Sequence, residues 1–75
     1  MNKNRRMQLK KLIEKIEIIK DELESIESDE QDYFDTMPEN LQGSTNGINS
    51  EEAIDKMADA VVYMEDVIEM IEEII

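Results

Sequence analysis

The residues of this chain that could do chemistry are almost all carboxylic acids. Of 75 residues, 20 are Asp or Glu, and the chain contains no Cys, no His and no Trp. Disulfides, zinc sites built from Cys and His, and acid–base catalysis by His are therefore excluded. The carboxylates can still bind a cation or present negative charge to a partner.

A metal site would need a spacing of carboxylates that the sequence does not offer. The densest cluster of acids lacks the central glycine and the spacing of a calcium-binding loop; it consists of Asp29, Glu30, Asp32 and Asp35. A two-metal site inside a helical bundle uses Glu-x-x-His pairs, which a chain without His cannot supply. We therefore expect no metal and no cofactor.

No group in the sequence indicates an enzyme. Nucleophilic and acid–base catalysis need a polarised group that is held in a pocket. The serines and threonines cluster near expected helix ends and turns, where capping of the backbone accounts for them. We expect a non-enzymatic protein without catalytic residues.

The basic residues are concentrated in the first part of the chain. Residues 1–20 contain seven Lys or Arg and two Glu, whereas residues 21–75 contain one base, Lys56, and eighteen acids. The net charge of −12 therefore consists of +5 in the first segment and −17 in the rest. This separation of charge bears on partners and self-association. The negative sign of the net charge argues against nucleic acid as a partner of the whole surface.

A first long helix is expected to carry the basic residues. Apolar residues from Leu9 to Met37 recur at alternating steps of three and four, with one gap at Glu30. This is an a/d heptad repeat, in which Leu9 takes position a. The repeat predicts a helix over about residues 3–35.

A second long helix is expected to carry most of the outward acids. Ile54 to Ile75 form an unbroken a/d repeat, and a third apolar column at position g consists of Ala53, Ala60, Val67 and Ile74. Asn49 and Glu52 have the spacing of a capping box, so the pattern predicts a helix over about residues 50–75. The connector, about residues 36–49, combines a short helical turn with a plain turn.

The two helices predict an all-α fold, an antiparallel two-helix hairpin that forms a single domain over residues 1–75. Two helices cannot bury a three-column apolar face, and a core of this size rarely supplies more than ~3–5 kcal/mol. We therefore expect a coiled-coil-like homodimer or higher oligomer, which is a four-helix bundle if dimeric. The expected oligomer core consists of Leu12, Ile16, Ile19, Leu23, Ile26, Ile54, Met57, Val61, Met64, Ile68 and Ile71.

A resemblance adds a biological context to these patterns. The chain begins M-N-K-N-R-R, and its centre reads D-E-Q-D-Y-F-D-T-M-P-E-N-L-Q-G-S over residues 29–44, followed by an acidic heptad helix. This order resembles a family of short acidic helical proteins from bacteriophages, prophages and their Gram-positive gut hosts. The resemblance implies a phage or mobile-element context and no particular activity.

The acidic outer surface indicates a binding protein. We expect an oligomeric bundle that inhibits or modulates a basic host protein, as an anti-defence factor or by mimicry of nucleic acid. The expected partner-binding residues are Asp55, Asp59, Glu65, Asp66, Glu69 and Glu73, with Tyr63 as an exposed anchor.

Two alternatives belong to other classes. The oligomer could sequester a phosphate-bearing signal nucleotide, in which case the phosphate contacts would be Arg5, Arg6, Lys10 and Lys11. It could also be a purely structural assembly protein that has neither partner. For the basic segment itself, pairing with the protein's own acidic helix, across the hairpin or across a dimer, is expected in preference to binding a phosphate or nucleic acid. No secretory signal or membrane-length apolar run is evident, so we expect a cytoplasmic protein, in the host cytoplasm if phage-encoded.

Overall fold

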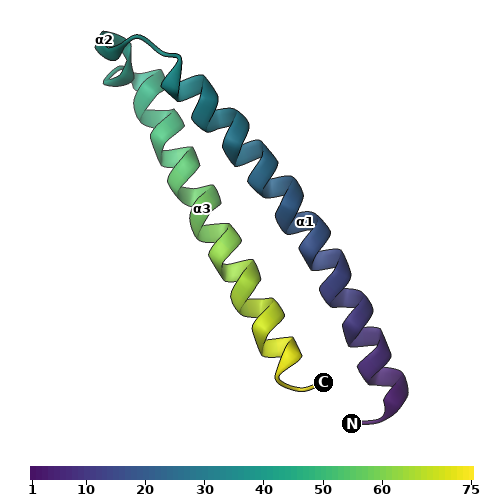
Figure 1. Cartoon of the computed structure of the whole chain (residues 1–75). Helices are drawn as coiled ribbons and strands as arrows, with labels where there is room; N and C mark the ends of the chain where they lie inside the picture. The colour runs from purple at the N-terminus through teal and green to yellow at the C-terminus, as the bar shows by residue number, and fades with distance from the viewer.

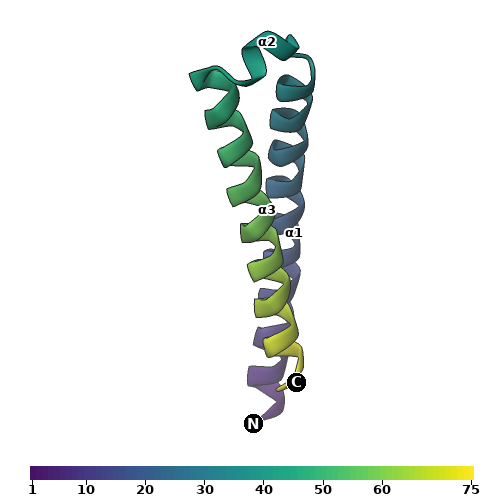
Figure 2. The same cartoon turned by 90° about the vertical axis from the view of Figure 1, so that its left-hand side faces the viewer.

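Three helices and no strand make up the protein in the computed structural model, which describes all residues from 1 to 75. They are α1 (Lys3–Asp35), α2 (Glu39–Gln42) and α3 (Thr45–Glu72), so the predicted all-helical class is confirmed. Figures 1 and 2 show α3 running back alongside α1, with both chain ends at the same end of the molecule. The helix pair α1 and α3 forms a rod of 58 × 15 × 12 Å.

Side-chain caps define both ends of α1. The Asn2 side chain accepts a hydrogen bond from the backbone N–H of Arg5 at 2.8 Å, which satisfies one of the free amides of the first turn. At the other end, the Thr36 hydroxyl donates to the carbonyl of Tyr33 at 3.0 Å. Pro38 follows two residues later and cannot continue the helix.

The connector is tied to both long helices by polar side chains. The Gln42 amide donates to the carbonyls of Phe34 and Met37, at 3.4 and 3.2 Å. The Ser44 hydroxyl accepts from the backbone N–H of Gly47 at 3.3 Å and caps α3. The central segment of the sequence therefore holds the two long helices in a fixed relation at this end of the rod.

The start of α3 differs from the sequence-based expectation. The helix begins at Thr45, five residues before the predicted start at about residue 50, because Ser44 rather than Asn49 provides the cap. Gly47 has a negative φ and lies within the first turns of the helix rather than in a plain turn. A Cβ at this position would lie against the backbone carbonyl of Gln42 and 2.8 Å from its Cα, so the close approach of the connector requires glycine.

The two long helices meet along a narrow seam. On α1 this seam uses heptad positions a and e instead of the a and d positions of the repeat. Leu12 and Tyr33 at position d are exposed, whereas Ile13 and Phe34 at position e are half-buried. The seam of α1 thus follows positions a and e, and consists of Leu9, Ile13, Ile16, Lys20, Leu23, Glu27, Glu30 and Phe34. The seam of α3 follows positions a and d, as predicted from its repeat, and runs from Ser50 through Val61 to Ile71.

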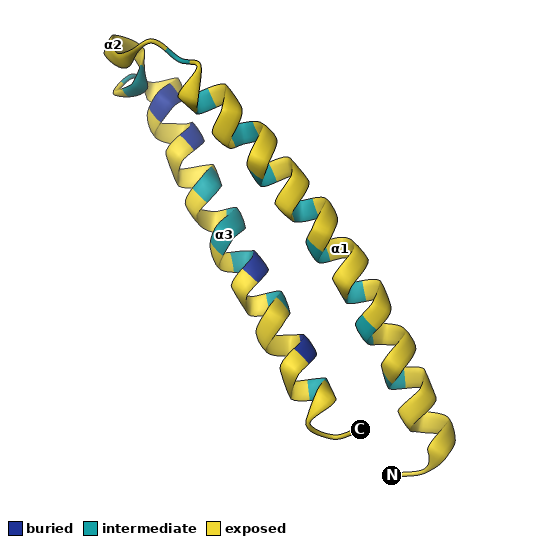
Figure 3. Ribbon diagram, in the orientation of Figure 1, coloured by how far each residue is buried: buried dark blue, intermediate teal, exposed yellow.

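The seam contains very little core. Only four of 75 residues are buried, and of these Val61 and Ile68 are the only ones with large apolar side chains. Figure 3 shows these few buried residues on the side of α3 that faces α1, with most of both helices exposed. Because three charged residues of α1 lie in the seam, the helix pair alone offers a weak hydrophobic core.

Candidate functional site

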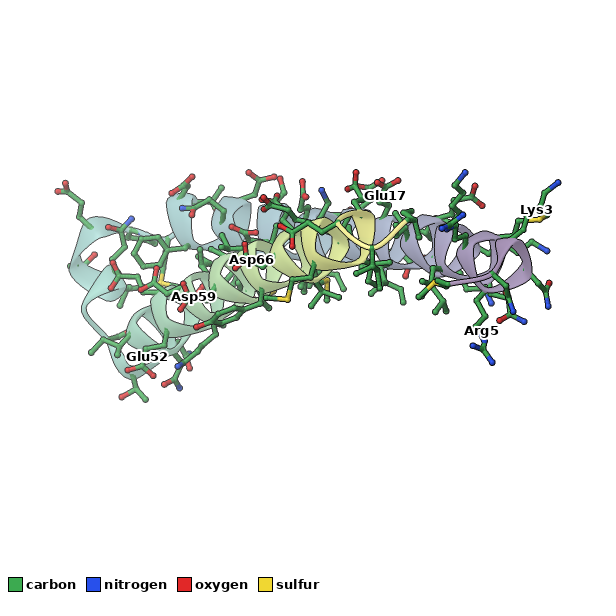
Figure 4. All side chains as sticks on the ribbon, turned by 90° about the horizontal axis from the view of Figure 1, so that it is seen from below. Lys3, Arg5, Glu17, Glu52, Asp59 and Asp66 are labelled. Atoms are coloured by element: carbon green, nitrogen blue, oxygen red, sulfur yellow. The ribbon has the colours of Figure 1, made fainter.

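Four acids on the outer side of α3 form a regular row. Glu52, Asp59, Asp66 and Glu73 share heptad position f and are all exposed. Seven residues correspond to about 10.5 Å along a helix, so this acidic row extends over roughly 30 Å. Figure 4 shows Glu52, Asp59 and Asp66 in succession along α3, and Lys3 and Arg5 at the opposite end of the molecule.

Three of these four were predicted as partner-binding residues, and Glu52 was not, because it was assigned to a capping box. The remaining predicted acidic residues of α3 are exposed and fall on different columns. Asp55 and Glu69 share position b, beside the acidic row, and no base pairs with either. Glu65 lies at position e, where its carboxylate is 3.8 Å from the ammonium group of Lys20. The predicted acidic face therefore contains one continuous part, at positions b and f, and one residue that is engaged with α1.

A polar groove lies on the same side of the helix pair as Glu65. Lys20 also approaches Glu24 at 3.9 Å, and these two contacts are the only ion pairs in the protein. The groove has a volume of about 420 Å³ and is lined by Glu24, Glu27, Ser28, Gln31, Ala58, Val61 and Glu65. One surface of the rod is thus polar and mainly acidic.

The opposite side of the helix pair is apolar. It carries the d column of α1 and the g column of α3, which we call the apolar face; its residues are Leu12, Ile19, Ile26, Tyr33, Ala53, Ala60, Val67 and Ile74. The four members from α1 are 46–57% exposed. An apolar groove of about 420 Å³ crosses this face and is lined only by Ile16, Ile19, Ala60, Tyr63, Met64 and Val67.

Tyr63, which was expected on the acidic surface, lines this apolar groove instead. Tyr63 is 69% exposed and lines the groove with Ala60 and Val67 of α3 and Ile19 of α1. Position c, which Tyr63 occupies, is next to position g on a helix, and this adjacency explains the placement. Tyr63 is therefore grouped with the apolar face rather than with the acids.

The predicted oligomer core is divided between the seam and the apolar face. Three of its residues, Leu12, Ile19 and Ile26, are exposed on the apolar face. The other eight are buried or half-buried between the two long helices and consist of Ile16, Leu23, Ile54, Met57, Val61, Met64, Ile68 and Ile71.

The bases at the start of α1 have no partner in the chain. Arg5, Arg6, Lys10 and Lys11 are exposed, form no ion pair and line no groove. Pairing with the acidic end of the second helix, expected for the whole basic segment, is made by Lys20 alone. The two long helices meet from Leu9 onward, so the first turns of α1 extend past the region of contact.

The acidic cluster near the connector has a structural contact that the sequence pattern did not reveal. The hydroxyl of Ser50, which is only 4% exposed, donates to the carboxylate of Glu30 at 2.6 Å. Glu30 therefore fills the gap in the heptad repeat with an interhelical hydrogen bond. No group of three or more acidic side chains converges in a way that could hold a metal ion.

Comparisons with known proteins add no relative to this description. No protein-family model, no curated protein and no solved structure matches the chain. Neither long helix has a stretch that is apolar enough to cross a membrane. The class that the structure defines is thus an all-helical protein with an extended pair of long helices, one apolar side and a largely acidic remainder.

Proposed function

We propose that the protein is a non-enzymatic binding protein, which assembles into a helical bundle and uses its acidic row to engage a basic surface of another protein. The observation that supports this function most directly is that none of the four carboxylates in the acidic row has a basic partner within the chain. Their charge is therefore available for an intermolecular contact.

The geometry of the row suits a long basic surface better than a small ligand. A helix holds the carboxylates at fixed intervals of about 10.5 Å. The two hollows that they line are formed by α3 and its C-cap alone: Glu52 and Asp59 line one of about 450 Å³, and Asp66 and Glu73 line one of about 270 Å³. Such an array favours fast, salt-sensitive association with a complementary positive surface. The basic groove of a nucleic-acid-binding protein is a surface of this kind, and occupying it would inhibit that protein.

The resemblance to phage and prophage proteins suggests where the partner is found. A protein that acts in this context meets the proteins of its bacterial host, in the host cytoplasm. We therefore propose a host protein as the partner and inhibition or modulation of that protein as the outcome, including a role against host defence.

A pull-down from a Gram-positive host lysate tests this function. The test variant neutralises the acidic row with Glu52→Gln, Asp59→Asn, Asp66→Asn and Glu73→Gln. The matched control removes the same number of charges from exposed positions of α1, with Glu14→Gln, Glu17→Gln, Asp21→Asn and Glu22→Gln.

The wild-type protein and the control should retain a basic protein at low salt and release it at high salt, while the test variant should not retain it. Association between exposed charges is screened within about 10 Å at 0.1 M salt, so sensitivity to salt is part of the expectation. Retention that survives neutralisation of the row, or that is insensitive to salt, would contradict the proposed function.

A further inference from the structure

The whole chain, an elongated rod, exposes more surface than a compact protein of its size. The accessible surface of the chain is 5737 Å². A compact monomer of 8.8 kDa is expected to expose about 4,800 Å². The excess of roughly 900 Å² is close to the ~800 Å² per partner that a stable protein–protein interface buries.

Charge is distributed very unevenly between the two ends of the rod. Residues 21–55, which form the connector end, contain twelve acids and no base. At the other end, residues 1–20 contribute +5 and residues 56–75 contribute −5, so that end is neutral overall. Two copies packed in parallel would place their two connector ends, each with a charge of −12, side by side.

We propose that a second copy of this chain covers the apolar face in an antiparallel orientation, with the chain termini of one copy beside the connector of the other. This arrangement places the unpaired bases at the start of α1 next to the acids of the partner's connector end. It gives those bases the neighbours that their own chain does not provide, and it separates the two acidic connector ends. The inference rests on the oligomeric part of the proposed function and is independent of the acidic row.

The apolar column of α1 matches the same column of a second copy that runs in the opposite direction. Leu12, Ile19, Ile26 and Tyr33 are spaced by seven residues, so reversing one copy about the middle of α1 places Ile19 against the partner's Ile26 and Leu12 against the partner's Tyr33. The same two-fold relation makes the interface isologous, as in most homodimers. Ala60 lies among the lining residues of the apolar groove, and its small side chain permits close approach of the partner helix.

The acidic row remains exposed in this dimer. Its position f lies about 100° around the helix from position g, which carries the α3 part of the apolar face. The dimer therefore presents two acidic rows, one from each copy, while the apolar surface is covered. This leaves the surface required by the proposed function accessible.

Spin labels on introduced cysteines test the orientation, because the chain has no cysteine of its own. Asn4→Cys and Asn40→Cys place labels at exposed positions near opposite ends of the rod, and Ser25→Cys places one near its middle. In the antiparallel dimer, two Asn4 labels lie about 50 Å apart, as do two Asn40 labels. A mixture of the two variants should give a short distance, below roughly 25 Å, because neighbouring helices in a bundle are about 10 Å apart.

Each other outcome overturns the inference. Short distances for Asn4 alone and for Asn40 alone would show that the two copies run in the same direction. The absence of a short distance from the Ser25 label would show that no dimer forms through this face. Neutralising the acidic row should leave all these distances unchanged, so a failed orientation test and a failed pull-down are separate results.

Discussion

Ile26 and Ile18 form a matched pair for testing whether the apolar face is buried between copies. Both are isoleucines of α1, and they are 57% and 59% exposed in the single chain. Ile26 lies in column d of the apolar face, whereas Ile18 lies at position c, about 100° further around the helix. Ile26→Asp should therefore weaken the dimer, and Ile18→Asp should have little effect on it.

The size of the effect follows from the exposed fraction of Ile26. Burial of a whole isoleucine side chain contributes about 1.5–3 kcal/mol, so burying roughly half of it contributes about 1–1.5 kcal/mol. Two copies lose this contribution in the dimer, about 2–3 kcal/mol in total, which corresponds to a dissociation constant roughly 30 to 150 times higher. The cost of bringing a carboxylate into an apolar interface adds to this change.

Sedimentation equilibrium over a range of concentrations measures the dissociation constant of both variants, and circular dichroism monitors their helix content. Asp has the same intrinsic helix propensity at both positions, so a general loss of helix would affect the two variants alike. Equal weakening of the dimer by Ile18→Asp and Ile26→Asp would show that the apolar face is not the interface. So would a dissociation constant of Ile26→Asp that stays within about threefold of the wild-type value.

Three further predictions concern the connector, the seam and the basic segment. Gly47→Ala should lower the free energy of unfolding by more than about 1 kcal/mol in urea titrations, because its methyl group would collide with the Gln42 backbone. Gly43→Ala, with open space around its Cβ and a φ of −85°, should change stability by no more than about 1 kcal/mol; equal losses would contradict the steric explanation. Ser50→Ala removes the only hydroxyl that donates to Glu30 and should cost about 1–3 kcal/mol by the same titration, whereas an unchanged midpoint would mean that solvent replaces this bond fully. Nucleotides should not raise the melting temperature, because the four predicted phosphate-binding bases line no groove in the chain; a rise that grows with nucleotide concentration would instead support the nucleotide-sequestering alternative.

The sequence predicts the helices of this protein well because their heptad repeats are long and regular. α1 occupies Lys3–Asp35, and its repeat alone indicates a helix over this range. What the repeat cannot specify is which flank of position a faces the neighbouring helix. Positions d and e lie on either side of a, and both carry apolar residues in α1, so Ile13 and Phe34 compete with Leu12 and Tyr33 for the seam.

The connector was harder to predict because several residues are competent caps. Ser44 and Asn49 both have side chains that can accept from a helix N-terminus, and sequence alone does not rank them. The structure selects Ser44, whose position is set by the Gln42 contacts to the end of α1. The hydrogen bond between Glu30 and Ser50 joins residues twenty positions apart, and only the folded helix pair brings them together.

For the charged residues of the candidate site, the sequence predicts exposure but not which residues of the other helix lie nearby. The exposure of the acidic residues of α3 follows from their heptad positions, which the sequence supplies. The separation of Glu65 and Tyr63 from the acidic row depends on where α1 lies, which the sequence of α3 does not contain. The lack of partners for the bases at the start of α1 likewise depends on how far α1 extends past α3.

The mass of the protein in solution shows whether the helical bundle exists, since the apolar face is covered only if a second copy binds to it. Light scattering coupled to size-exclusion chromatography at micromolar concentrations should give twice the chain mass of 8.8 kDa, or a higher multiple. A single species of 8.8 kDa across this concentration range would contradict the account, because the apolar face would then remain exposed without a partner.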